Sequence, residues 1–534
     1  MSGFWTRLGA AFFPISYPGG DPTAGPGLVS NPFPGLEAGT HRRRMSVFTP
    51  VSEHVNTLLA NAGATTVARA RWLVRNNGYA RAALRSWSTA TVGAGIKPSP
   101  LIVEPELKSA VALAWADWTD QADAEDLTDF YGITLRVARE AYIAGECFVH
   151  ILPRPVDANL LVPLQLLVLP AEQLPLWKNE LAPNGNPIRL GVEFNRAGER
   201  VAYWFWRRHP GDAPLGFATA LAAEELQRIP ADEIIHVFDA TEAGQVRGLS
   251  AYAPAIVKLF LMDIYDDAEL ERKKQAARFA AFIKKPAIDW SNPDHVRAAA
   301  EAAAGDSSDG AISYYGPGAV LELHDGEDLT FSEPADVGPN YEGFQYRTLL
   351  QIAAALGVPY TELSHDLTKA SYASSRAGTL SFWGNVEAHQ YAVMVYLFLR
   401  RVYERWMQAA VVAGAVPISA GRYNRERIAL TRFRAITAKK PWVDPMKDRA
   451  AEALAVQNGF KSRSDVIEAE GFDPDETDQR IAEDRERERR LGLDFTPVTR
   501  VASAPRQTMP MGVDSTSGGT DGGTDEAQQR GDAA

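Results

Sequence analysis

The longest helical pattern in the chain runs from Ser250 to Lys285 and limits how the rest can fold. Ser250 is a good N-cap residue, and Pro254 falls in the first turn, where a missing N–H does little harm. At 1.5 Å per residue this helix would be about 50 Å long. A small insert of different composition follows it, and then a second helical pattern over residues 341–356. The sequence therefore predicts a hairpin arm of two helices with a tip.

Apolar and charged residues are both ordered along the first of these helices. Its apolar positions predict one face, made of Val257, Leu261, Ile264 and Ala268. Acidic residues come first in its charged part, namely Asp263, Asp266, Asp267, Glu269 and Glu271, and basic residues follow, namely Arg272, Lys273, Lys274, Lys284 and Lys285. Paired acids on such a helix are typical of a solvated face, although paired carboxylates also occur in catalytic sites.

A segment of small, hydroxyl-rich residues with two basic side chains precedes another long helical pattern. Residues 367–383 read LTKASYASSRAGTLSFW and begin with small, hydroxyl-rich residues. Between Arg347 and Arg400 the sequence has two cations, Lys369 and Arg376. From residue 375 to residue 411 no proline interrupts, and YAVMVYLFL predicts a helix buried over much of its length. The hydroxyl-rich front is either an ordinary helix cap or a mobile loop.

The first half of the chain alternates in a way that predicts an α+β fold. We expect helices over residues 51–88, 107–122 and 129–143, then strands over 146–153, 164–170, 191–206 (a hairpin around 196–198) and 233–239. Residues 13–40 are rich in Pro and Gly, which is typical of an arm or linker. Residues 502–534 have almost no apolar side chains and are expected to be disordered.

Bulk composition excludes several classes of protein. The net charge of −12 excludes a nucleic-acid binder held by general positive charge, but a surface along which DNA slides should repel phosphate over most of its area. The one cysteine, Cys147, lies in an apolar stretch and predicts a buried, inert thiol. The richest apolar run, residues 159–170, is too short to cross a bilayer, so no membrane contact is expected.

No catalytic or cofactor motif stands out. The nine histidines are scattered without metal-ligand spacing. Residues 364–366, Ser-His-Asp, contain the residue types of a hydrolytic triad, but adjacent residues cannot adopt its geometry by themselves. The glycine turns near Gly93 and Gly316 lack the lysine of a phosphate loop. We expect no enzyme, no cofactor and no metal.

Five blocks, taken in order, resemble the lambda family of phage portal proteins. They are residues 68–100 (an Arg-rich helix, an Asn-Asn turn and VGAGIKP), 138–153, 229–256, 356–383 and 442–474. The resemblance covers roughly residues 45–495. One departure is SYASSR, where Ala373 interrupts the usual Tyr-Ser-Ser run.

The resemblance implies a predominantly helical α+β portal fold with wing, stem hairpin, clip insert, channel loop and helical crown. The implied parts are a flexible arm (1–44), wing (45–249), first stem helix (250–286), clip (287–340), second stem helix (341–358), channel loop (359–378), long wing helix and strand (379–440), crown (441–501) and disordered tail (502–534). The channel loop would offer DNA the side chains of Lys369, Ser371, Tyr372, Ser374, Ser375 and Arg376, and the stem acids would face the channel.

The resemblance also implies partners and a location. Members of the family form a ring, usually of about twelve subunits, at one capsid vertex. Double-stranded DNA passes through it, the terminase large subunit docks on it, and head-completion or adaptor proteins follow, beside the major capsid or scaffold protein. The location would be the virion, with assembly in the host cytoplasm. Two alternatives stay open: a DNA-binding adaptor of a phage or prophage particle that forms no ring, and an enzyme with an unrecognised hydrolytic site.

Overall fold

The structure, a computed structural model, describes ten stretches of the chain. They are residues 50–155, 159–212, 226–276, 282–284, 290–297, 300, 328–330, 340–368, 371–438 and 445–493. The predicted arm, most of the predicted clip and the predicted tail lie outside them. The chain forms two units, divided after Asp473. The described part of the second unit is essentially one charged helix, α16 (Pro474–Leu491), without a buried side chain.

The helices predicted in the first half of the chain are confirmed. They are α2 (Val55–Leu58), α3 (Ala64–Asn76), α4 (Gly78–Val92), α5 (Pro105–Thr119) and α6 (Phe130–Ala144), with a π-helical turn, η3 (Leu59–Gly63), between the first two. Asn77 separates α3 from α4, because its backbone is extended and its side chain caps α4 by accepting a hydrogen bond from the N–H of Ala80 at 2.8 Å.

The strands confirm the α+β prediction. In one sheet β2 (Glu146–Pro153) lies between β3 (Leu164–Leu169) and β9 (Ile234–Phe238), antiparallel to both. A second antiparallel sheet has the order β4 (Glu180–Leu181), β5 (Pro187–Arg189), β6 (Val192–Phe194), β7 (Arg200–Trp206), β8 (Leu226–Pro230), and β6–β7 is the predicted hairpin. A third pair joins distant segments, β1 (Lys97–Pro100) and β12 (Phe433–Ile436).

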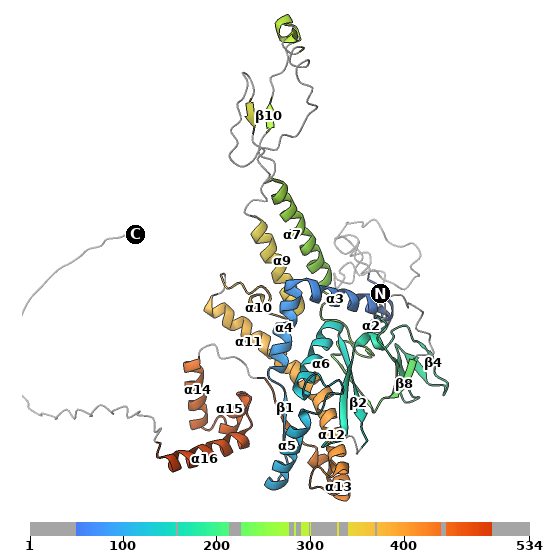
Figure 1. The fold of residues 1–534 in the computed structure, drawn as a ribbon, viewed down its shortest axis with the longest axis vertical. Coiled ribbons are helices and arrows are strands. Elements are labelled where there is room, and N and C mark those ends of the chain that lie inside the picture. Colours follow the sequence, from blue (N-terminus) through green and yellow to red (C-terminus); the bar gives the residue numbers. More distant parts are fainter. Residues whose placement is uncertain are drawn as a thin grey trace, which may run out of the picture. The chain divides into compact units, whose positions relative to one another are not determined.

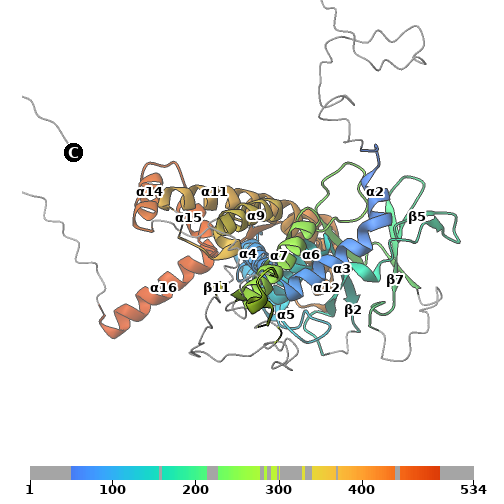
Figure 2. The same ribbon diagram turned by 90° about the horizontal axis from the view of Figure 1, so that it is seen from above.

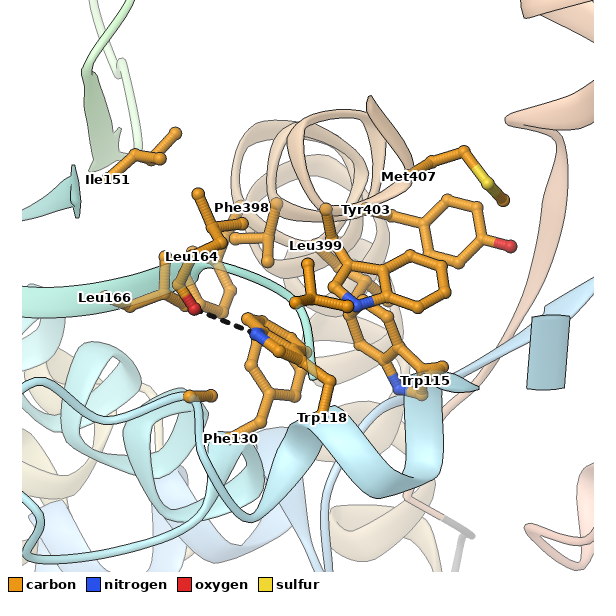
Figure 3. Close-up of a cluster of buried hydrophobic side chains, with 14 of the residues drawn as sticks. Trp115, Trp118, Phe130, Ile151, Leu164, Leu166, Phe398, Leu399, Tyr403 and Met407 are labelled. Atoms are coloured by element: carbon orange, nitrogen blue, oxygen red, sulfur yellow. Dashed lines mark hydrogen bonds between the residues drawn. The ribbon is translucent and has the colours of Figure 1, made fainter. Parts of the chain in front are cut away.

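The long helix in the second half passes through the main core. It consists of α11 (Tyr372–His389), a π-helical stretch η6 (Gln390–Leu399) and α12 (Arg400–Ala413), and α13 (Ala420–Leu430) follows. Figure 3 shows Phe398 and Tyr403 of this helix among Trp115, Trp118 and Phe130. The predicted burial is confirmed for one side of this helix, but Tyr391 and Tyr396 of the apolar run are exposed at 71% and 49%. Its π-helical stretch was not predicted.

The first arm helix is shorter than predicted. The expectation of one helix from residue 250 to residue 285 is wrong at both ends, since α7 spans Ile256–Ala276. The hydroxyl of buried Ser250 donates to the carbonyl of Ile143 at 2.6 Å, and the chain then runs through turns before α7. At the other end β10 (Phe282–Lys284) pairs with β11 (Asp328–Thr330), so strand pairing replaces helical bonds there. Both departures come from partners distant in sequence.

Helices α7 and α9 (Asn340–Leu356) form the predicted hairpin (Figures 1 and 2). Asp266 of α7 accepts hydrogen bonds from Tyr341 at 2.8 Å and from Gln345 at 3.3 Å. Lys258, nearer the start of α7, donates to Gln351 at 2.6 Å. The two helices are therefore antiparallel. Their base packs in one hydrophobic cluster with α3, α4, α6 and α10 (Tyr360–Ser364).

Candidate functional site

The candidate residues lie on the α7–α9 hairpin and at the start of α11. In the described stretches no group of three or more His, Cys, Asp or Glu residues could hold a metal ion. The described helices are all too short or too polar to cross a membrane. Cys147 is buried, and burial raises the pKa of its thiol well above the usual value.

Two of the predicted channel acids point into the subunit. Asp263 accepts a hydrogen bond from the side-chain amide of Asn77 at 2.7 Å, so it ties α7 to the turn between α3 and α4. Asp266 is held by Tyr341 and Gln345 of α9. Burial and the hydrogen bond to Asp266 raise the pKa of Tyr341 to about 12, so the phenol stays a donor at neutral pH. Asp266 therefore holds α7 against α9, and Asp263 holds α7 against the turn between α3 and α4.

The other three acids differ in exposure. Glu269 is mostly buried and pairs with Arg272 at 2.7 Å. Glu271 is exposed and pairs with Lys274 at 2.7 Å. Asp267 is exposed and makes no hydrogen bond or ion pair within the part of the chain that the structure describes.

The predicted basic residues of the first arm helix either contact other side chains or lie outside the described part. The ammonium group of Lys273 lies over the ring of Tyr341, 5.7 Å from its centre. Lys284 is in β10, and its side chain lies outside the description, as does all of Lys285. No cluster of free cations therefore forms on the described part of α7.

At the start of α11 the hydroxyls form a helix cap. Ser371 accepts a hydrogen bond from the N–H of Ser374 at 3.2 Å, and the N–H of Ser371 donates to the Ser374 hydroxyl at 3.0 Å. This reciprocal arrangement is a capping box. Arg376 pairs with Asp448 of α14 (Pro445–Gln457) at 3.3 Å, and Ser375 is half-buried. Lys369 and the side chain of Tyr372 lie outside the described part.

The apolar face predicted on the first arm helix exists, but it is exposed to solvent. Val257 is 63% exposed, Leu261 56% and Ile264 49%, and Ala268 is exposed as well. The opposite side of α7, with Leu259 and Met262, is the one buried in the subunit. We call Val257, Leu261, Ile264 and Ala268 the α7 stripe. Exposed apolar surface of this kind is a candidate interaction site.

Sequence reasoning missed a buried ionic cluster near the start of α7. Glu146, the first residue of β2, accepts hydrogen bonds from Arg247 Nε at 2.8 and 2.9 Å, from His236 Nε2 at 2.9 Å and from the N–H of Gly248 at 2.9 Å. Burial alone would raise the pKa of Glu146, but the charge of Arg247 and the hydrogen bonds outweigh it and lower this pKa to about 2. Burial lowers the pKa of His236 to about 4 despite the neighbouring carboxylate.

Arg247 also donates to three backbone carbonyls, those of Leu174 at 3.0 Å, Leu190 at 2.7 Å and Ala171 at 3.2 Å. The chain passes tightly here, because a Cβ on Gly248 would lie 2.1 Å from the carbonyl oxygen of Gly145. The signal available in the sequence was a glutamate at the start of an apolar strand, which predicts a partner but does not say which.

Comparison with known proteins gives one consistent result. A model described as "Phage portal protein, lambda family" matches residues 41–390. The probable portal protein of Halomonas phage phiHAP-1 is 30% identical over 339 residues, which is 61% of this chain and 61% of that protein. Portal protein B of Escherichia phage lambda is 24% identical over 498 residues, 84% of this chain and 88% of that one. The portal protein of Escherichia phage N15 is 25% identical over 494 residues, again 84% and 88%.

Among solved structures, the neck of a native GTA particle computed with C12 symmetry has a similar chain, with 15% identity and a TM-score of 0.42 over 78% of this chain and 94% of that one. The neck of an empty GTA particle, computed with C6 symmetry, gives 17% identity and a TM-score of 0.42 over 80% and 96%.

Proposed function

Because the chain belongs to the lambda family of phage portal proteins, structural proteins of the phage head–tail connector, we propose that it closes into a ring of about twelve subunits at one capsid vertex. Genomic DNA would enter and leave the capsid through the opening of this ring. The hydrolytic enzyme that the sequence left open is set aside, since the family is structural rather than enzymatic.

The main support for a ring is the α7 stripe. A folded subunit leaves Val257, Leu261 and Ile264 about half exposed or more, on the face of α7 that its own α9 does not cover. Burying apolar area contributes about 25 cal/mol per Å². Each contact in which a neighbouring subunit covers this face would therefore stabilise the ring. A head-to-tail contact of this kind closes into a ring when its rotation fits.

We assign the portal parts to the elements of the fold. Helices α7 and α9 form the stem, and the insert between them, with β10 and β11, forms the clip. The wing consists of the two sheets with α2 to α6 and the helix from α11 to α12. The crown contains α14, α15 (Arg463–Ala469) and α16. The terminase large subunit and later the head-completion or adaptor proteins would dock on the completed ring, beside the capsid or scaffold protein. Assembly would take place in the host cytoplasm and the finished ring would belong to the virion.

For the channel we propose that one segment contacts the DNA and that a stem acid repels it. The segment around the start of α11, residues 367–373, projects into the channel, where Lys369 makes weak, salt-sensitive contacts with phosphate. The capping box of Ser371 and Ser374 anchors this loop to α11. Of the stem acids, Glu271 is exposed and can repel DNA at the channel wall. Repulsion acts over about 8 Å at physiological salt.

The test is electron microscopy of the purified full-length protein in negative stain. Closed rings with an axial opening are expected across a range of protein and salt concentrations. Only monomers or two-fold dimers under all these conditions would contradict the proposal. Binding of DNA by monomers in a gel-shift assay would instead favour the adaptor.

A further inference from the structure

The hairpin has a second uncovered face, on α9. Leu349, Ile352 and Leu356 of α9 are buried in the subunit. The other side of this helix carries Gly343, Arg347 and Ala354, which are exposed, and Leu350, which is half-buried. We call these four residues the α9 outer face. A Cβ added at Gly343 would meet nothing within 4 Å, so this end of the face is open.

The contacts between α7 and α9 show which residues of the two helices lie at the same position along the hairpin axis, which we call their height. Asp266 lies level with residues 341–345, and Lys258 lies level with Gln351. One step toward the end of α7 is therefore one step toward the start of α9. By this register the four residues of the α7 stripe alternate in height with the four of the α9 outer face. Side chains that alternate in this way pack as ridges into grooves.

Charge completes the match. Asp267, beside the α7 stripe, is exposed and has no ionic or hydrogen-bonding partner within the described residues. Arg347, on the α9 outer face, is exposed and equally unpaired there. By the same register they differ in height by about five residues, or about 8 Å, a distance that an extended arginine side chain largely spans. The two faces carry opposite charges, and neither takes part in the contact between α7 and α9.

We propose that the α7 stripe of one subunit packs on the α9 outer face of the next, with an ion pair between Asp267 and Arg347 of the neighbouring subunit. This inference rests on the proposed ring, whose axis would run along the hairpin. A second copy of the chain is the occupant because it supplies both an uncovered face with small residues at positions 343 and 354 and the opposite charge within reach of Asp267. The contact is head-to-tail, as a ring requires. Asp267 is then an interface residue rather than a free channel acid.

Cysteine crosslinking tests the contact directly. Ala268 and Gly343 are small and exposed, and they lie on the two faces that should meet. A chain carrying both Ala268→Cys and Gly343→Cys should give, after mild oxidation of assembled rings, a ladder of covalent multimers on a non-reducing gel. The native thiol of Cys147 is buried and should not contribute.

The single variants supply the matched controls. Each alone should stay monomeric on the gel, because equal faces do not meet in a head-to-tail contact. Rings assembled from a mixture of the two single variants should give covalent dimers and no larger species. Rings of the double variant that yield only monomers on the gel would overturn the inference while the ring itself stands. Wild-type protein that never forms rings would overturn the proposed function and this inference together.

A charge exchange tests the ion pair without new cysteines. Asp267→Arg or Arg347→Asp alone places like charges opposite each other and should raise the protein concentration needed for half-assembly by about tenfold. The double exchange should restore assembly toward the wild-type concentration. If the double variant assembles no better than the worse single variant, the pairing of these two residues is wrong.

Discussion

Arg247 donates its Nε hydrogen to both carboxylate oxygens of Glu146, at 2.8 and 2.9 Å, although the residues are 101 positions apart. Both side chains are buried, at 1% and 4% exposure. Glu146 starts the central strand β2, and Arg247 lies in the segment between β9 and α7. The pair therefore fastens the base of the hairpin to the sheet.

Removing the arginine from this pair should destabilise the subunit strongly. Arg247→Met keeps much of the side-chain length but leaves Glu146 buried without its cation, together with three carbonyls that lose a donor. We expect a loss of about 3–5 kcal/mol in the free energy of unfolding, measured with urea. Lys274→Met, which breaks the exposed pair with Glu271, is the control and should cost at most about 1 kcal/mol. Equal losses in the two variants would show that Arg247 contributes little.

Acid should destabilise the subunit in two overlapping ranges. The pKa of folded His236 is about 4, below its ordinary 6.5. Between these values the unfolded chain binds a proton that the folded protein refuses, so stability falls as the pH drops from about 6.5 to about 4. The pKa of folded Glu146 is about 2, below its ordinary 4.5. Its contribution is complete above about 4.5 and is lost as the pH falls toward 2.

Urea unfolding at a series of pH values measures both effects. His236→Gln retains a hydrogen-bond donor beside Glu146 and does not titrate, so it should flatten the decline between pH 6.5 and 4.5. Each proton contributes a slope of at most about 1.4 kcal/mol per pH unit. An unchanged slope in the His236→Gln variant would assign the decline to other groups.

Two tryptophans in the main core provide a matched pair. Trp118 donates from Nε1 to the carbonyl of Leu164 at 2.9 Å (Figure 3), whereas Nε1 of Trp115 finds no acceptor in the described part of the chain. Both rings pack against Phe130. Replacing either by Phe removes similar volume, but Trp118→Phe also leaves the Leu164 carbonyl unpaired. It should cost about 1–3 kcal/mol more than Trp115→Phe in urea unfolding. Equal costs would mean that this hydrogen bond is energetically unimportant.

A deletion around the start of α11 tests DNA packaging separately from ring assembly. Deleting residues 368–373 should leave rings intact, because ring closure rests on the stem and wing, but should impair DNA packaging or retention. Ser371→Ala is the control for the helix cap and should cost about 1 kcal/mol of subunit stability with packaging preserved. A deletion variant that packages and retains full-length DNA as the wild type does would remove the channel-loop assignment.

Local sequence patterns were sufficient for most elements. The helices before β2, the strands β2, β3, β6, β7 and β9, and α9 follow from apolar periodicity and from turn residues, which act over a few positions. Strands β4, β5 and β8 were not predicted. The same reasoning misjudged the ends of α7, since Ser250 bonds to Ile143 and β10 pairs with β11. Both partners are distant in sequence and leave no local signal.

The candidate site shows the same limit at the level of single residues. The charge pattern located the stem acids, but it could not distinguish Asp263 and Asp266, which point inward, from Asp267, which does not. On a helix each residue turns about 100° from the last, so the register with α9 decides which acid is free. The apolar stripe was predicted correctly as a face, yet only the packed subunit shows that the described residues leave this face uncovered.

The central claim is that the α7 stripe holds neighbouring subunits together, and mass photometry of stripe variants tests it most directly. The wild-type protein should give one dominant species at about twelve times the 58.3 kDa chain mass. Leu261→Asp and Ile264→Asp place a carboxylate in the buried interface and should give mainly monomers with an unchanged circular-dichroism spectrum. The matched control Leu454→Asp alters an exposed leucine of α14, away from the stripe, and should assemble as the wild type does. Rings of unchanged mass and stability in both stripe variants would contradict the account.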